Sequence, residues 1–158
     1  MELAMEELNG RTGHEAGRQL LEKLYRRVTG QMMPAIAVTE LGKPYFVEGG
    51  WHFSISHTDS HVFCALSRSN IGLDAEPMGR PVSPKLADRY LSDGEKGCLG
   101  DDPQDAILRL WVLKEAEAKR TGQGIGNWLK CTDFDPFDER IQEMNGHYVA
   151  VLEDEYAL

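Results

Sequence analysis

Hydrophobic residues recur along this chain in two patterns, one with the spacing of a helix and one with the spacing of a strand. Within residues 14–29 the leucines return every three or four positions, which predicts a helix that Gly30 would end. A second long helix is expected to start at Asp102, because Asp102 can cap it and Pro103 suits its first turn, and to run to about Arg120. These two segments are the helical framework that the sequence predicts.

Shorter apolar runs, separated by turn residues, are typical of strands and short helices. A short helix is expected within 83–92, and Ser92 followed three residues later by Glu95 is a capping box that would start another. This mixture of helices and strands predicts one α+β domain. The expected strands lie on either side of a turn at 41–44 and at 53–56, 62–66, 71–76, 141–143 and 147–152.

The overall composition fits a single globular unit and limits where the protein can work. The chain has 158 residues, of which 41% are hydrophobic and 27% charged, as in ordinary soluble domains. No apolar run approaches the ~18 residues that a membrane span needs. The first ten residues are acidic, without the basic and apolar regions of a signal peptide. We therefore expect a soluble, cytoplasmic protein with no membrane partner.

Charge and cysteine content argue against two further kinds of site. The net charge is −9, and residues 132–158 hold eight acids against Arg140 alone, so the clustered basic surface that binds nucleic acid is not expected. The three cysteines are widely spaced and form no CxxC pair, which argues against a disulfide framework and against a zinc site. Cys64, within an apolar run, is expected in the core; the other two are Cys98 and Cys131.

The stretch NIGLDAEP, residues 70–77, places two carboxylates at the end of an apolar strand. Side chains two apart in a strand point the same way, so Asp74 and Glu76 would share one face. A solvated strand end is one interpretation, and a site for a hard cation such as Mg²⁺ is the other. The two acids alone do not decide between them.

The second long helix carries another set of charged residues within LWVLKEAEAKRTGQGIG, residues 110–126. Helical spacing places Trp111, Lys114, Glu115 and Lys119 on about one side. Glu115 and Lys119 could form a solvated i,i+4 pair worth only about 0.2–0.5 kcal/mol. The alternative is a functional site, because a helix that is apolar on two sides rarely needs such a cluster.

Three further segments contain polar residues with both a structural and a functional interpretation. Ser56 and His57 end a strand, where they are either surface residues or donors to a phosphate. Lys43 lies in a turn within GKP, and Arg18 lies on the first helix; both would ordinarily be solvated. None of these signals decides alone.

The order of these segments resembles the 4′-phosphopantetheinyl transferase superfamily. The similar blocks are LGKPYF, HFSISHTDSHVFCAL, IGLDAEP, RYLSDGE and LWVLKEAEAKRTGQGI, within about 12–152. The chain looks most like the two-lobed type that activates peptide and polyketide synthetases. The resemblance implies antiparallel sheets packed with helices. It also implies transfer of the phosphopantetheine arm of coenzyme A to a serine of an acyl or peptidyl carrier protein, with Mg²⁺ and release of 3′,5′-adenosine bisphosphate.

The resemblance also implies roles for individual residues. The metal ligands would be Asp74, Glu76 and Glu115, and Glu115 would activate the carrier serine directly or through water. Catalysis would further use Lys119, near the phosphates, and His57. The coenzyme would be bound by Lys43, Ser56, His57, Arg18, Lys114 and Lys119. The region LSDGEKGCL would meet the carrier, with a basic patch at Lys85, Arg89 and Lys96.

Two pseudo-symmetric lobes are implied, an incomplete first lobe at about 12–70 and a second lobe at about 71–158. Family members usually have a longer N-terminal stretch with a strand and basic residues, whereas this chain has an acidic lead of eleven residues. Self-association to a homo-oligomer could then complete the site. A non-catalytic module that binds coenzyme A or a carrier is the alternative function. A general Mg²⁺-dependent phosphohydrolase ranks last, because it leaves the SISH and GKP blocks unexplained.

Overall fold

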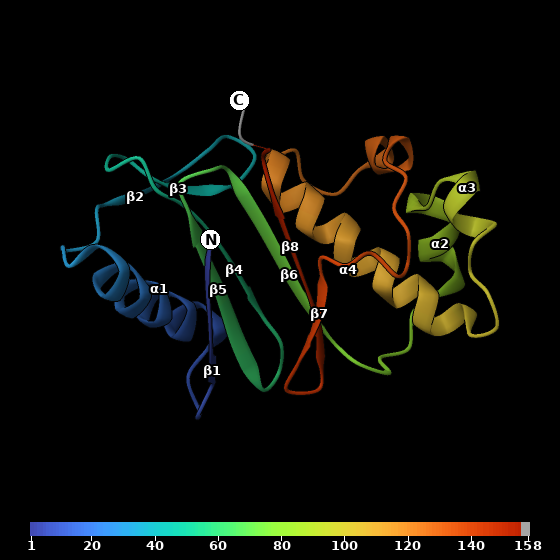
Figure 1. Cartoon of the computed structure of the whole chain (residues 1–158), viewed down its shortest axis with the longest axis horizontal. Helices are drawn as coiled ribbons and strands as arrows, with labels where there is room; N and C mark the ends of the chain where they lie inside the picture. The colour runs from blue at the N-terminus through green and yellow to red at the C-terminus, as the bar shows by residue number, and fades with distance from the viewer. Residues whose placement is uncertain (156–158) are drawn as a thin grey trace.

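Figure 1 shows a computed structural model of the chain, which describes residues 1–155. Every helix and strand expected from the sequence is present within a few residues of its expected bounds. In this part of the chain, β1 and the short 3-10 helix η1 have no counterpart among the expected elements. The elements are β1 (Glu2–Glu7), α1 (Gly13–Thr29), β2 (Ile36–Val38), β3 (Pro44–Phe46), β4 (His52–His57), β5 (His61–Ser67), β6 (Ile71–Pro77), α2 (Pro84–Tyr90), α3 (Asp93–Lys96), α4 (Pro103–Thr121), η1 (Asn127–Cys131), β7 (Ile141–Met144) and β8 (His147–Glu153).

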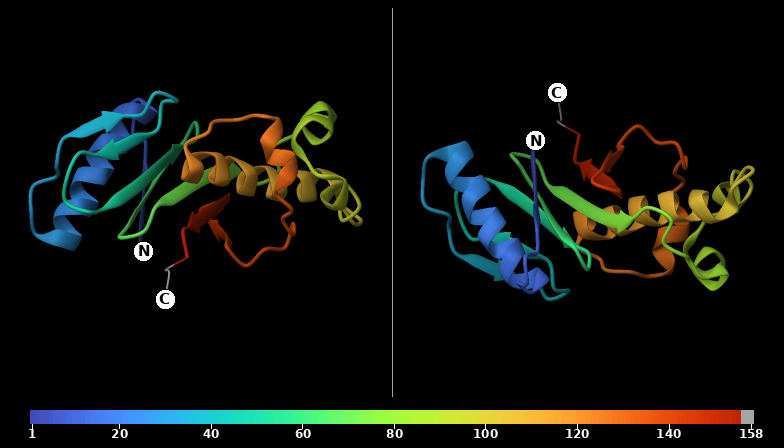
Figure 2. Two further views of the ribbon diagram at one scale, coloured as in Figure 1. Left: turned by 90° about the horizontal axis from the view of Figure 1, so that it is seen from above. Right: turned by 90° about the horizontal axis from the view of Figure 1, so that it is seen from below.

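Two antiparallel sheets lie between the two long helices (Figure 2). Alternate residues of β5 face opposite ways, as a strand requires. Val62, Cys64 and Leu66 pack against α1, whereas Phe63 and Ala65 pack against the second sheet. The far face of the second sheet packs against α4. The α+β class with antiparallel sheets is therefore confirmed.

The two three-stranded sheets have the same topology. Each sheet, together with the long helix that packs on it, is called a lobe. Their strand orders are β1-β5-β4 and β6-β8-β7, so in each sheet the first strand pairs with the third, and the third with the second. In each lobe a long helix lies in the sequence between the first strand and the later hairpin. The sheet topology thus repeats the order strand, helix, hairpin.

The acidic N-terminal lead contains a strand of the first sheet, which was not among the expected elements. Its strand β1 pairs with β5 from Glu2 opposite Leu66 to Glu7 opposite His61. Leu3 and Met5 pack between the two sheets. The acidic glutamates hide this alternation of apolar side chains in the sequence. Whether the first lobe is incomplete relative to longer members of the family stays a prediction.

Capping residues fix the ends of both long helices, and of these the sequence predicts Gly30 and Asp102. Thr12 and Glu15 form a capping box at the start of α1, and Gly30 ends it in the left-handed conformation. Asp102 accepts a hydrogen bond from the third residue of α4, and Gly122 ends that helix with φ 72°. The second capping box, from Ser92 to Glu95, is also present, at the start of α3.

The close approach of α4 to β6 depends on Gly72. A Cβ atom at this position would lie 2.0 Å from the carbonyl oxygen of Ala116 and 2.4 Å from the amide nitrogen of Arg120. Backbone atoms cannot move aside cheaply, so only glycine permits this contact. Because Asp74 and Glu76 follow Gly72 on the same face of the strand, they point toward the same helix.

Side-chain hydroxyls join the two lobes where β4 lies beside β6. Ser54 Oγ accepts a hydrogen bond from the amide of Leu73 at 2.9 Å, and Ser56 Oγ accepts one from the amide of Ala75 at 3.2 Å. The buried amides of β6 are thereby satisfied without a regular strand ladder. This junction places the end of β4 next to the two acids of β6.

The expected place of Cys64 in the core is confirmed. Cys64 is buried, and burial raises the pKa of its thiol to about 12, whereas Cys98 and Cys131 are exposed and unpaired. Across residues 1–155, none of the helices has the length and apolar character needed to span a bilayer.

Candidate active site

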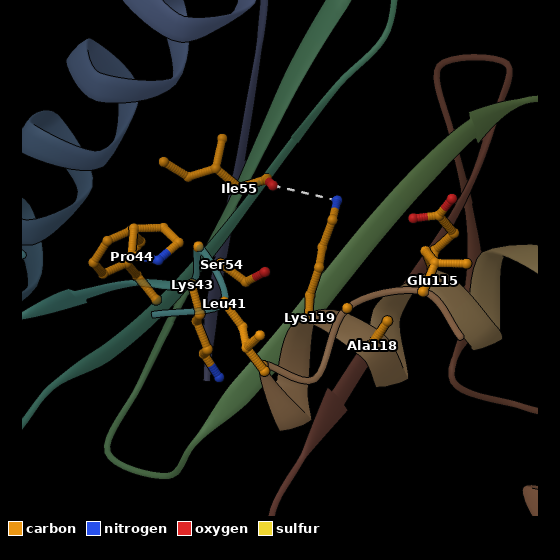
Figure 3. A pocket seen from close by; sticks show the side chains of 13 residues that line it. Leu41, Lys43, Pro44, Ser54, Ile55, Glu115, Ala118 and Lys119 are labelled. Carbon is orange, nitrogen blue, oxygen red and sulfur yellow. Dashed lines mark hydrogen bonds between the residues drawn. The ribbon is translucent and has the colours of Figure 1, made fainter. Parts of the chain in front are cut away.

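Two adjoining hollows lie between the lobes, and they meet at Ile55 and Lys119. The apolar hollow has a volume of about 280 Å³ and lies between the β2–β3 turn, β4 and the end of α4, as Figure 3 shows. The polar hollow has a volume of about 700 Å³ and lies between the ends of β4 and β6. The apolar hollow includes Leu41, Lys43, Pro44, Ile55, Glu115, Lys119 and Ile125; the polar hollow includes Ser56, His57, Asp74, Glu76, Arg80 and Lys119.

Asp74 is the most buried acid of the polar hollow. Its Oδ1 accepts hydrogen bonds from Lys119 Nζ at 3.0 Å and from Ser56 Oγ at 3.1 Å. Its Oδ2 is buried and has no hydrogen-bond partner in the described part of the chain. Burial raises the pKa of this carboxyl, and the Lys119 ammonium opposes the rise. A buried carboxylate oxygen left unpaired is costly, and therefore marks a position where a cation would be stabilised.

Glu76 lies beside Asp74 on the same face of β6, as the D-x-E spacing predicts. Burial raises the pKa of Glu76, and the nearby charge of Asp74 raises it further. The guanidinium of Arg80 forms an ion pair with Glu76 and partly offsets this effect. The two strand acids therefore form one site rather than a solvated strand end.

Glu115 lines the apolar hollow, and Figure 3 shows its carboxylate apart from the Lys119 ammonium. Burial raises the pKa of Glu115 to about 7, and the charge of Asp74 contributes. This carboxyl is consequently half ionised near neutral pH. A group with such a pKa can both accept and release a proton under physiological conditions.

Lys119 joins the two hollows through a tertiary contact that helical spacing does not reveal. Besides its contact with Asp74, its Nζ donates a longer hydrogen bond to the carbonyl oxygen of Ile55 at 3.4 Å (Figure 3). The solvated pair with Glu115 is replaced by an ion pair with Asp74 within the second lobe, and only the contact with Ile55 crosses to the first lobe. Lys119 therefore links α4, β4 and β6 at the centre of the site.

The structure gives Ser56 and His57 different roles. The Ser56 hydroxyl donates to Asp74 and accepts from a β6 amide, so it positions Asp74 and is not a free phosphate donor. His57 is exposed and reaches the polar hollow. A Cβ atom at Gly13 would lie 2.3 Å from the His57 ring, so α1 approaches this imidazole very closely.

Arg18 and Lys43 lie near the site, but neither points its charge into the polar hollow. Arg18 lines a separate cavity of about 190 Å³, which His57 also reaches. Lys43 covers the apolar hollow with its stem, while its ammonium donates to Asn70 Oδ1 and to the carbonyl oxygen of Arg120, both at 2.6 Å. Lys43 therefore caps the end of α4 and ties it to the first lobe.

Lys114 is placed away from both hollows, which contradicts its expected role in binding the coenzyme. Its side chain is fully buried and forms an ion pair with Glu95 at 2.6 Å. The ammonium also donates to the carbonyl oxygens of Leu129 and Thr132 and to the Thr132 hydroxyl. Every donor of the ammonium is thus engaged, and Lys114 holds the α3 and η1 segments onto α4.

Arg80 is the residue of this site that sequence reasoning missed. It belongs to the polar hollow and pairs with a site carboxylate. Its signal in the sequence is weak, because an arginine four residues after Glu76 and beyond a strand is usually solvated. Only the turn after β6 brings it back to the acids.

Comparison with known proteins identifies the family to which these residues belong. A family model described as the 4′-phosphopantetheinyl transferase superfamily matches residues 70–155, more than half of the chain. The chain belongs to this superfamily. The matched segment contains both strand acids of the site, together with Arg80, Glu115 and Lys119.

Curated members of the 4′-phosphopantetheinyl transferase superfamily are similar to much of this chain. A 4′-phosphopantetheinyl transferase of Bacillus subtilis is 33% identical over 125 residues, which are 76% of this chain and 53% of that protein. The transferase Sfp of Bacillus subtilis strain 168 is 35% identical over 91 residues, or 54% of this chain and 40% of Sfp. The transferase gsp of Aneurinibacillus migulanus is 34% identical over 90 residues, or 54% of this chain and 37% of gsp. The chain thus spans about half the length of these relatives or less.

The donor chemistry of this site fits Mg²⁺ at the strand acids. Residues 1–155 contain no group of three or more potential ligands already arranged around one point. Asp74 and Glu76 share the polar hollow, and the orphan Oδ2 of Asp74 provides the hard oxygen that Mg²⁺ prefers. Glu115 lines the adjoining apolar hollow. Its side chain would have to move before it could bind the same ion as Asp74 and Glu76.

The raised pKa of Glu115 makes the stability of the metal-free protein depend on pH. The folded state holds this proton up to about pH 7, whereas the unfolded chain releases it near 4.5, so the free energy of unfolding falls as pH rises between these values. We expect Glu115→Gln to stabilise the protein at pH 8 by about 1–2 kcal/mol, after allowance for the solvent that still reaches this side chain. Urea unfolding in the presence of a chelator measures the effect.

The matched control is Glu40→Gln, which alters an exposed carboxylate in the β2–β3 turn. It should change stability little at any pH. The gain of Glu115→Gln should vanish below pH 4.5, where both states are protonated. An equal gain at pH 4 and pH 8 would contradict the role of the carboxylate charge.

Proposed function

We propose that this chain transfers the 4′-phosphopantetheine arm of coenzyme A to a serine of an acyl or peptidyl carrier protein in an Mg²⁺-dependent reaction. The observation that carries the proposal is the meeting of Asp74, Glu76 and Lys119 beside Glu115, with one buried carboxylate oxygen left unpaired. A structural cluster would have no reason to leave that oxygen without a partner. Relatives that match this chain are named 4′-phosphopantetheinyl transferases, and the proposal assigns the same activity to the site of this chain.

The residues of the two hollows suit the parts of such a reaction. Asp74 and Glu76, joined by Glu115, would hold the ion, which when bound neutralises charge on the pyrophosphate of the coenzyme. Lys119 would stabilise the negative charge that grows on the leaving oxygen. His57, exposed at the opposite wall, would contact a phosphate, and Lys43 would hold the α4 end in place.

Glu115 would accept the proton of the carrier serine, directly or through water. The serine oxygen then forms a bond to the β-phosphorus while the bond from that phosphorus to the bridging oxygen breaks. The electron pair leaves on 3′,5′-adenosine bisphosphate, and the proton stays on Glu115 until solvent takes it. As the base, Glu115 must be ionised before attack and must lose the proton afterwards.

Further features of the proposal concern partners and assembly. The basic residues of α2 and its neighbour would attract an acidic carrier; they are Lys85, Arg89 and Lys96. A cytoplasmic setting and no nucleic-acid partner fit the composition. A homo-oligomer could add residues to the first lobe.

A mass measurement tests the proposed reaction. We expect an apo carrier protein, mixed with the chain, coenzyme A and Mg²⁺, to gain the mass of one phosphopantetheine arm. The same carrier with its serine replaced by alanine is the control, and should gain nothing. Binding of coenzyme A without any mass gain across a panel of apo carriers would overturn the transfer and favour a non-catalytic binding module.

A further inference from the structure

We propose that Arg80 is a built-in counter-cation of the carboxylate site, which holds Glu76 in the metal-free protein and is displaced when a divalent cation binds. This inference rests on the proposed function, because it takes the same carboxylates as the place where the ion binds. The inference adds Arg80 to the site and adds a step in which the divalent cation replaces Arg80 at Glu76. Binding of the cation by the carboxylates alone would not require this step.

The geometry of the turn after β6 brings Arg80 to the site. The amide of Arg80 donates to the carbonyl oxygen of Pro77 at 3.2 Å, and Gly79 between them has φ +76°, as a tight turn requires. The turn folds the guanidinium back onto Glu76, the last acid of the strand. Arg80 thereby reaches a carboxylate whose side chain is only 11% exposed.

The balance of charge at the site favours an exchange. Three carboxylates, those of Asp74, Glu76 and Glu115, face the two cations Lys119 and Arg80, so one negative charge remains when all are ionised. A divalent cation in place of Arg80 would neutralise the summed charge of these three carboxylates and Lys119; the exposed Asp59, which also lines the polar hollow, lies outside this count. The unpaired Oδ2 of Asp74 indicates where the charge is still uncompensated while Arg80 is in place.

Arg80, rather than Lys119, is the cation able to leave. The Lys119 side chain is 32% exposed, and its ammonium contacts Asp74 and a β4 carbonyl from a rigid helix. The Arg80 side chain is 50% exposed and follows a glycine in a surface turn. Among residues 1–155, its guanidinium pairs with Glu76 alone. Its removal from the site therefore breaks one half-exposed ion pair, a modest cost.

Calorimetric titration of the full chain with MgCl₂, without coenzyme A or carrier, tests the exchange. We expect Arg80→Gln to bind Mg²⁺ about two- to tenfold more tightly than the natural protein, because no ion pair has to be broken. Arg80→Lys, which keeps the competing charge, should restore most of the natural affinity. Arg27→Gln, at an exposed position on α1, removes the same net charge and should leave the affinity unchanged.

Two further measurements separate displacement from simple repulsion between cations. The tighter binding of Arg80→Gln should persist at 0.5 M NaCl, where interactions between separated surface charges are screened. The side-chain Nε–H signal of Arg80 in an NMR spectrum should shift on addition of Mg²⁺. It should not respond in Glu76→Gln, in which the ion pair is already absent.

Weaker or unchanged Mg²⁺ binding by Arg80→Gln would overturn the inference, as would a gain that disappears in salt. Failure of the natural protein to bind Mg²⁺ at millimolar concentration would overturn it as well. If the exchange is observed but no carrier gains mass, the proposed transfer fails while the role of Arg80 stands.

Discussion

Replacing Asp74 with alanine is expected to abolish phosphopantetheine transfer, with a loss of at least about a hundredfold in turnover. The carboxylate holds Lys119 and Ser56 in place and presents the unpaired oxygen at which the ion would bind. Its buried charge is costly to the fold, as its raised pKa shows. The loss of activity should therefore occur in a protein that remains folded.

The measurement is the rate at which an apo carrier gains mass, together with the urea midpoint of the variant. Asp101→Ala, which changes an exposed acid in the loop before α4, is the matched control and should retain full activity. Near-normal turnover by Asp74→Ala would contradict its assignment as a metal ligand. Lost activity with a collapsed midpoint would show instead that Asp74 is needed for folding.

Replacing Lys114 with methionine is expected to reduce the free energy of unfolding by about 3–5 kcal/mol. The change removes the ammonium from a fully buried pair and leaves the Glu95 carboxylate without its counter-charge. It also leaves the backbone carbonyl of Leu129 without its lysine donor. The effect is large because water cannot reach the groups that lose their partner.

Lys130→Met, at an exposed position sixteen residues later in η1, removes the same charge and should alter stability by less than about 0.5 kcal/mol. In a double-mutant cycle, Glu95→Gln together with Lys114→Met should cost less than the two single changes added together. Equal losses for Lys114→Met and Lys130→Met would show that the buried pair contributes little.

Most of the secondary structure was predictable because its signals are local. Capping residues such as Thr12 and Asp102 and the glycines after each long helix act within a few residues of the chain. Strand β1 was missed because its glutamates conceal the partly buried Leu3 and Met5, and because its pairing with β5 spans most of the first lobe. Pairing between distant segments leaves no local trace.

The sequence allowed us to predict that the acids and Lys119 belong to the candidate site. It did not allow us to predict which groups the basic residues contact. The D-x-E spacing places Asp74 and Glu76 on one face, and the structure confirms that they share a hollow. Helical spacing put Lys114 near the functional side of α4, although the α3 segment binds it elsewhere. The partner of a long, flexible lysine side chain depends on elements that lie far away in the sequence.

The sequence by itself determined most elements of this protein, its family and the carboxylates at the end of β6. The tertiary structure decided how those carboxylates are compensated: Lys119 reaches Asp74 from α4, Lys43 caps α4, and Arg80 folds back onto Glu76. The physical reason is the difference in sequence separation over which the interactions act. Backbone patterns and caps act over a few residues, whereas burial and charge pairing depend on which surfaces meet after the two lobes have packed.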